Sequence, residues 1–129
     1  MEVPLNSATI SIKTAEHYRW GMDCDGWHLL KSPDLSVIQE CIPPGRSEVR
    51  HYHVVSRQFF FVLAGTLTVE IRGRVHVLRL HEGLEIPPGQ PHRVFNDTPS
   101  DVSFLVISQP PSHGDRVLSD EPTPTQGRS

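Results

Sequence analysis

The chain has 129 residues, a length that suits one domain with a sizeable hydrophobic core and not two. Its 12 Lys and Arg against 15 Asp and Glu give a formal net charge of −3, so we expect no nucleic-acid partner. The two cysteines, Cys24 and Cys41, are too few for a disulfide framework. No apolar run approaches ~20 residues and no charged start precedes an apolar run, so we expect no membrane partner, no signal peptide and a cytoplasmic location.

The first part of the chain predicts one strand and then an irregular segment. Residues 9–13 alternate between polar and apolar side chains, which is typical of a half-buried strand. Residues 18–27 contain Gly, Asp and Cys residues that break this regularity, and both tryptophans, Trp20 and Trp27, lie there. We expect the two indoles to close one end of the fold or to pack against a second subunit. The alternative is that one of them stacks on a ligand.

The middle of the chain predicts a succession of short strands separated by turns. An apolar, β-branched run over residues 35–42 ends at a Pro-Pro-Gly sequence, as a strand does at a turn. Further strands are predicted over residues 49–54, 58–63, 66–71, 75–80, 84–86, 92–96 and 101–108. With no amphipathic helix and no internal repeat, this pattern indicates an all-β sandwich or barrel. We expect a single domain over residues 1–129, with its core over about 33–110 and a loose, polar, proline-rich tail over 111–129.

Three histidines and a glutamine are spaced as candidate metal ligands. His51 and His53 are one residue apart, so on a strand both imidazoles point to the same face. Gln58 lies on the next predicted strand, and His92 follows a Pro-Pro-Gly turn. Imidazole nitrogens with one amide oxygen suit a divalent transition metal such as Zn, Ni, Fe or Mn, without choosing among them.

These two stretches resemble the two sequence motifs of the cupin family. The first motif is met, at every spacing, by Gly45, His51, His53, Gln58 and Gly65, and the second by Pro87, Gly89, His92 and Asn96. Gln58 stands where the family pattern has Glu, and His81 stands where the second motif begins with Gly. The resemblance implies a double-stranded β-helix, or jelly-roll, barrel. It also implies a metal inside on His51, His53, Gln58 and His92, a small-molecule ligand and a homodimer.

Strand parity assigns the neighbouring side chains to faces. With His51 and His53 inward, Val49 is expected inside, and Arg50 and Tyr52 outside. With Gln58 inward, the outward side chains of its strand are large and apolar, which makes this face the candidate dimer contact. They are Phe59, Phe61 and Leu63.

The sequence also contains polar residues near these motifs that are not candidate metal ligands. Gln39 and Cys41 share a parity on the strand that enters the first motif, and either could face the pocket. Glu70 and Glu85 are expected on the surface, and Asn96 is expected to hold the turn after the His92 strand.

The glutamine ligand has a consequence for function. With Gln58 in place of a carboxylate, a bound divalent ion keeps a net charge near +2 and attracts an anionic substrate more strongly. Small cupins that open unsaturated uronate rings look similar in using three His and one Gln. Their acid and aromatic residues, however, would fall on Val106 and Ser108 here, so the sequence does not supply that acid–base machinery.

Two functions therefore stay open. The first is a metal-dependent enzyme of the isomerase, ring-opening or dioxygenase type that acts on a small anionic or sugar-like molecule. The second is a non-catalytic, metal-containing module that binds or senses a ligand. An inward acid or base within hydrogen-bond reach of the ligand separates them, and the sequence shows no obvious one.

Overall fold

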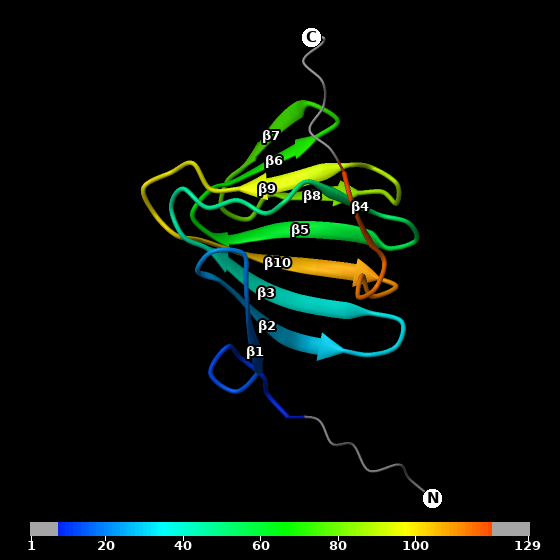
Figure 1. Ribbon diagram of the computed structural model, residues 1–129. Helices are drawn as coiled ribbons and strands as arrows, with labels where there is room; N and C mark the ends of the chain where they lie inside the picture. The colour runs from blue at the N-terminus through cyan, green and yellow to red at the C-terminus, as the bar shows by residue number, and fades with distance from the viewer. Residues whose placement is uncertain (1–7, 120–129) are drawn as a thin grey trace, which may run out of the picture.

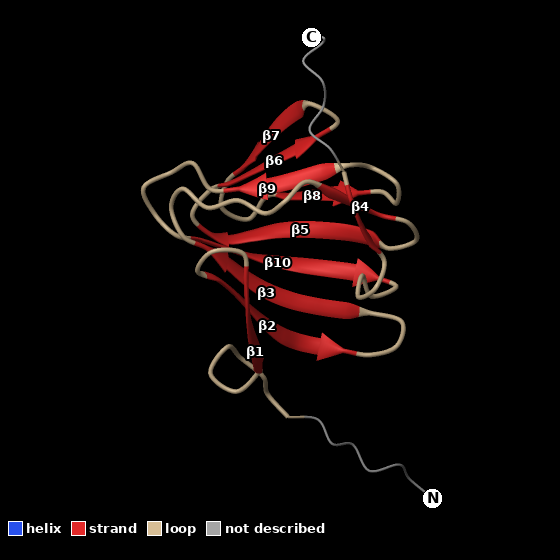
Figure 2. Cartoon of the chain, in the orientation of Figure 1, coloured by secondary structure: helices blue, strands red, loops and turns tan. Residues whose placement is uncertain are grey.

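The computed structural model describes residues 8–119, and these consist of eleven β-strands and no helix (Figures 1 and 2). None of the described residues therefore forms a helix long and apolar enough to cross a membrane. The strands are β1 Glu16–Trp20, β2 Cys24–Lys31, β3 Ser36–Ile42, β4 His51–His53, β5 Arg57–Ala64, β6 Leu67–Ile71, β7 Arg74–Leu78, β8 Gly83–Ile86, β9 His92–Phe95, β10 Val102–Gln109 and β11 Arg116–Leu118.

The strands form two antiparallel sheets. The larger has the order β1-β2-β3-β10-β5-β8, and the smaller has the order β11-β4-β9-β6-β7. Figure 1 shows β5, β10, β3 and β2 side by side, with the smaller sheet folded over them. Strands that are neighbours in a sheet are mostly far apart in the sequence, as in a jelly roll. The predicted fold class, an all-β double-stranded β-helix, is confirmed.

The core lies between the inner faces of the two sheets. On β10 every second residue is buried, including Phe104, and on β5 Phe60 and Val62 point the same way. The rings of Phe60 and Phe104 meet edge to face with centroids 6.0 Å apart. Gln58 shares the inner face of β5 with Phe60 and Val62, so the core strand itself directs the amide inward.

The N-terminal part of the sequence prediction was wrong. Residues 11–14 form a turn, in which the N–H of Ala15 donates to the carbonyl of Ser11 at 2.8 Å, and the first strands are β1 and β2 instead. Gly26 was one of the residues for which the sequence predicted an irregular segment, but it lies inside β2. The ring of Tyr18 lies directly over this glycine. A Cβ at residue 26 would lie 2.2 Å from Cζ of Tyr18. This close approach needs glycine, and it directs Tyr18 across the sheet.

The strand predicted over residues 49–54 is shorter, and the parity of its first residues was wrong. Only His51–His53 are in β4, so alternation does not extend back to Val49, which is 60% exposed, or to Arg50, which is 3% exposed. Arg50 is buried because its guanidinium pairs with Glu70 on β6. Glu70, expected on the surface, is therefore buried as well.

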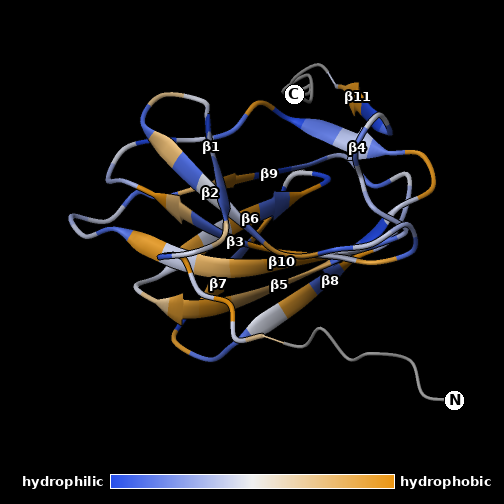
Figure 3. Cartoon of the chain, turned by 90° about the horizontal axis from the view of Figure 1, so that it is seen from below, coloured by the Kyte–Doolittle hydropathy of each residue, from blue (hydrophilic) through white to orange (hydrophobic). Residues whose placement is uncertain are grey.

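Part of the segment that was expected to be loose, Arg116–Leu118, forms β11 in the smaller sheet. Figure 3 shows β11 beside β4. In this ladder Arg116 is opposite His53 and Leu118 is opposite His51. Together with β1 and β2, this strand extends the sheets beyond the expected core of residues 33–110. The rest of the predicted tail, residues 120–129, lies outside the described residues.

Two further predictions concern the outer surface and a turn. Phe59 is 39% exposed and stacks in part on Phe61, which agrees with the outward parity of β5, and the homodimer stays a prediction. Asn96 is structural, as expected. Its Nδ2 donates to the carbonyls of Ile42 (2.8 Å) and Ser100 (2.7 Å), which ties the turn after β9 to the end of β3.

Candidate metal centre and its pocket

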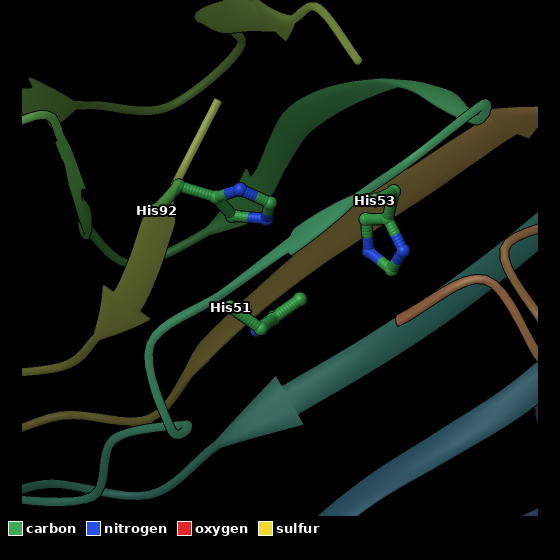
Figure 4. Close-up of side chains that lie close together, drawn as sticks. All are labelled: His51, His53 and His92. Atoms are coloured by element: carbon green, nitrogen blue, oxygen red, sulfur yellow. The ribbon is translucent and has the colours of Figure 1, made fainter. Parts of the chain in front are cut away.

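Three buried histidines converge between β4 and β9. His51 and His53 lie on the same face of β4, and His51 is directly opposite His92 in the ladder between β4 and β9. One ring nitrogen from each residue lies within 4.8 Å of the others. Figure 4 shows the three imidazole rings turned toward a common space. This spacing is suited to three ligands of one metal ion.

Backbone carbonyls fix the orientation of two of these rings. Nδ1 of His51 donates to the carbonyl of Val49 at 2.8 Å, and Nδ1 of His92 donates to the carbonyl of Gln90 at 2.9 Å. Because a carbonyl only accepts, Nδ1 carries the proton and Nε2 carries the lone pair in both rings. Nε2 of His92 is buried without a hydrogen-bond partner. Second partners of this kind are typical of histidines that bind a metal.

Gln58 reaches the same cavity from β5 and is also held by a partner. Its Nε2 donates to Oγ of Ser108, the opposite residue on β10, at 3.0 Å. This hydrogen bond assigns the amide orientation and leaves Oε1 of Gln58 buried without a partner. Ser108 thus has a role here that orients the amide, at the position where the uronate-opening cupins have an aromatic residue.

The electrostatics of the cluster fit a cation. Burial lowers the pKa of His51 to about 3 and that of His92 to about 4, and burial also lowers the pKa of His53. The imidazoles are therefore neutral at neutral pH and offer lone pairs. Two buried acceptors, Nε2 of His92 and Oε1 of Gln58, have no hydrogen-bond partner. Burying an acceptor without a partner costs free energy of folding. A divalent ion fits this donor set.

His51 and His53 line a cavity of about 200 Å³, whereas His92 is not among its lining residues. Its lining residues are Tyr18, Trp20, Ile38, Glu40, Glu48, His51, His53, Gln58, Phe60, Val94, Val106, Ser112 and Arg116. Two of these side chains, Glu40 and Glu48, carry carboxyl groups that the sequence analysis missed.

The parity assigned to β3 was wrong. Ile38 and Glu40 line the cavity, whereas Gln39 and Cys41 do not. The signal was present, because Glu40 alternates with Ile38 and Ile42, and Ile42 is buried in the core. An acid on the apolar face of a strand is a departure that indicates a functional group.

Glu40 is paired with a tyrosine hydroxyl. The hydroxyl of Tyr18 donates to Oε2 of Glu40 at 2.9 Å. The ring of Tyr18 reaches Glu40 by passing over Gly26, where a Cβ would block it. Burial raises the pKa of Glu40 to about 7, against the opposing effects of this hydrogen bond and of Arg116. Burial, and secondarily the charge of Glu40, raises the pKa of Tyr18.

Glu48 lies just before β4, beside the first histidine. Its Oε1 accepts a hydrogen bond from the N–H of Val94 at 3.2 Å, and its Oε2 lies 3.9 Å from Nδ1 of His51. Burial, and secondarily the charge of Glu40, raises its pKa to about 8. Both carboxyl groups thus have a pKa raised into the neutral range, and the charge of Glu40 contributes to the pKa of Glu48.

The two tryptophans have different positions. Trp20 lines the cavity and packs against the core, with its Nε1 donating to the carbonyl of Asp25 at 3.2 Å. Trp27 instead packs on His17 at the outer edge of the larger sheet, with ring centroids 5.3 Å apart. Of the two, Trp20 is placed to contact a ligand.

The fold and the histidine cluster define a class, the small double-stranded β-helix barrels with a candidate metal site. Residues 38–108 match the family described as "Cupin domain", and the chain belongs to this family. The matched range contains all three histidines, Gln58, Glu40 and Glu48, whereas Tyr18 and Arg116 lie outside it.

Three similar proteins indicate where this chain lies within the family. It is 31% identical over 85 residues to the tetracenomycin polyketide synthase protein TcmJ of Streptomyces glaucescens, which covers 64% of this chain and 57% of that protein. It is 30% identical over 91 residues to the oxidoreductase macE of Penicillium terrestre, which covers 67% of this chain and 35% of that protein. The chain thus spans less than two thirds of the length of either relative.

Among solved structures, the polyketide cyclase RemF of Streptomyces resistomycificus superposes with a TM-score of 0.74 at 19% identity and covers 93% of each chain. At this identity the likeness is one of fold.

Proposed function

We propose that the protein is a metal-dependent enzyme that transfers a proton next to a carbonyl group of a small oxygenated molecule, as a cyclase or isomerase does. The observation that carries this proposal is the pair of half-buried carboxyl groups, Glu40 and Glu48, in the cavity that His51 and His53 of the histidine cluster also line. They supply the inward acid and base that separate an enzyme from a binding module.

The proposed metal ligands are His51, His53, Gln58 and His92. A divalent ion on these donors would polarise a carbonyl oxygen and make an adjacent C–H group more acidic. Because Gln58 is neutral, no ligand charge offsets that of the ion. The hydrogen bond from Ser108 keeps the Oε1 lone pairs of Gln58 available, and the carbonyls of residues 49 and 90 do the same for Nε2 of His51 and His92.

The two carboxyl groups have separable roles. The Tyr18 hydroxyl donates to Glu40 and so favours its ionised form, which makes Glu40 the proposed base that takes the C–H proton. Glu48, whose pKa burial raises and whose Oε2 lies 3.9 Å from Nδ1 of His51, is the proposed acid that returns a proton to the substrate. The apolar side chains of Phe60, Val94 and Val106 exclude water from this step.

The relatives support the cyclase branch. TcmJ is described as a polyketide synthase protein and RemF as a polyketide cyclase. A polyketide chain carries carbonyl groups on alternate carbons, and the C–H groups between them are the acidic positions that this site would deprotonate.

A second candidate, oxidation with a redox-active metal, is favoured by one observation, the 30% identity to a protein described as an oxidoreductase. Three imidazoles also suit iron.

The first test is metal content, followed by proton exchange. Protein purified without chelators or a nickel column is analysed for metals, and deuterium uptake from D₂O into an aryl ketone with slow spontaneous exchange is followed by NMR. Glu40→Gln and Glu48→Gln are expected to keep their metal and to lose exchange by roughly 10²–10⁴-fold.

The outcomes separate the candidates. Exchange that survives in both variants would contradict the proposed roles of the two carboxyl groups. Loaded protein with no exchange and no oxygen uptake would be a binding module, and iron with oxygen uptake would favour oxidation.

A further inference from the structure

The segment after β10 is fixed to the barrel by a network that involves one carboxylate. The carboxylate of Asp115 accepts hydrogen bonds from the backbone N–H groups of Val54 (3.1 Å), Val55 (3.0 Å) and Ser56 (2.7 Å). The Ser56 hydroxyl donates to the carbonyl of Pro110 at 2.6 Å. We call residues 110–119 the C-terminal strap. The strap is held to the turn that joins β4 to β5, directly after the histidine strand.

The strap places Arg116 at the cavity without a direct ion pair, although its charge acts at longer range on Glu40 and Glu48. Arg116 is opposite His53 in the ladder, lines the cavity, and is the one Arg or Lys among the lining residues. Its Nη2 lies 3.5 Å from the carbonyl of Val49 and 3.5 Å from Nδ1 of His51, both long contacts. Within the described residues no carboxylate lies within the 4.0 Å limit of an ion pair with Arg116.

Other arginines near the barrel are compensated. Arg50 and Arg93 both contact Glu70, and Arg57 lies 3.7 Å from Glu85 on the outer face. The guanidinium of Arg116, by contrast, makes no direct ion pair among the described residues, and its planar array of N–H donors suits two oxygens of one carboxylate or phosphate group.

A second cavity of about 430 Å³ adjoins the first cavity at Arg116. It shares five lining residues with the inner cavity, namely Tyr18, Ile38, His53, Ser112 and Arg116. Its other lining residues include His28, Lys31 and His113 and no Asp or Glu. The inner cavity, by contrast, contains Glu40 and Glu48. The charged lining therefore differs between the two cavities, with Glu40 and Glu48 in the first, Lys31 in the second, and Arg116 lining both.

We infer that Arg116 binds an anionic group of the substrate, so that the enzyme acts on a ketone that carries a carboxylate or phosphate group away from its reacting carbonyl. This inference rests on the proposed function. An anion bound at Arg116 orients such a molecule with its carbonyl toward the histidines and its charge at the junction with the second cavity. Arg116 is a specificity-determining residue in this arrangement, and Asp115 is a positioning residue that acts through it.

The test compares an anionic ketone with its neutral counterpart. Binding of 4-benzoylbutyrate, its neutral amide and 3-benzoylpropyl phosphate is measured by calorimetry on metal-loaded protein. Since a hydrogen bond to a charged group contributes about 1.5–3 kcal/mol, the wild type should prefer an anion over the amide by roughly 10–100-fold. Whichever anion binds more tightly identifies the carboxylate or the phosphate class.

Variants assign the preference to the strap. Arg116→Gln is expected to bring the ratio of anion to amide affinity close to 1 with unchanged metal content, and Arg116→Lys to restore part of it. Asp115→Asn should reduce the ratio while Arg116 is still present, and Arg57→Gln, on the outer face, should leave it unchanged.

The readouts distinguish two failures. Equal binding of anion and amide by the wild type, or an anion preference that persists in Arg116→Gln, would overturn the inference even if the protein exchanges ketone protons. An anion preference that Arg116→Gln abolishes, in protein without proton exchange, would support the anion site and overturn only the proposed chemistry.

Discussion

The burial of Glu40 predicts that replacing it with Gln stabilises the metal-free protein at alkaline pH. The folded-state pKa of about 7 is raised from a usual value of 4.5, so between these values the folded state binds more protons than the unfolded state. The free energy of unfolding must then fall as the pH rises through this window, and the whole loss is present above it. Gln has no charge to desolvate and retains a carbonyl that can accept the Tyr18 hydrogen bond.

The expected size of the effect follows from the same values. One pKa unit corresponds to about 1.4 kcal/mol, so a rise from 4.5 to about 7 corresponds to about 3 kcal/mol at most. The advantage of Glu40→Gln over the wild type should be below about 1 kcal/mol at pH 5 and should approach about 3 kcal/mol at pH 8.

The assay is urea denaturation in EDTA at pH 5, 6, 7 and 8, because a nearby cation would favour the ionised carboxylate. Glu85→Gln, which replaces an exposed carboxylate on β8, is the matched control. A difference for Glu40→Gln that changes with pH no more than that of the control would refute the description of Glu40 as a desolvated acid.

Three further predictions test the metal site and the turns. Gln58→Glu should tighten divalent-metal binding on the order of tenfold by adding an anionic ligand, and His51→Ala should weaken it by at least as much. Metal affinity is measured by competition with a chelator. An affinity that neither variant changes would show that these residues are not metal ligands. Gly65→Ala should cost well over ~1 kcal/mol in urea denaturation, because φ is +80° and a Cβ would lie 2.4 Å from a backbone oxygen. Gly73→Ala, at φ +83° with nothing within 4 Å, should cost only about 1 kcal/mol, and equal costs would contradict the steric argument. Asn96→Ala should cost about 1–3 kcal/mol, since two carbonyls lose their donor, and a neutral result would show that water replaces the amide.

The sequence predicts the barrel well because its core strands are periodic. On β5 and β10 the alternation of buried and exposed side chains is regular, so the inward direction of Phe60 and Gln58 follows from parity alone. The spacing of His51, His53 and His92 likewise anticipates a cluster that the structure brings within 4.8 Å.

Parity fails where a ladder ends. Arg50 lies one residue before β4, so the alternation of that strand does not predict which way its side chain points. Its guanidinium is buried because it pairs with Glu70. The missing acid–base groups were hidden for a related reason. Glu40 lies on a strand whose inward face was misassigned, and Tyr18 and Arg116 reach the pocket from segments far away in the sequence. Such approaches depend on tertiary packing that no local pattern encodes.

The position of Tyr18, Trp20, Ser112 and Arg116 outside residues 38–108 has an evolutionary consequence. The segment that matches the family holds the histidines, Gln58 and both carboxyl groups, while the flanking segments complete the wall. Under the proposed function, the reacting groups therefore lie within the segment that matches the family, and the proposed anion contact, Arg116, lies outside it. A change confined to the flanking segments would alter the wall that a substrate meets and leave the histidines, Gln58 and both carboxyl groups in place.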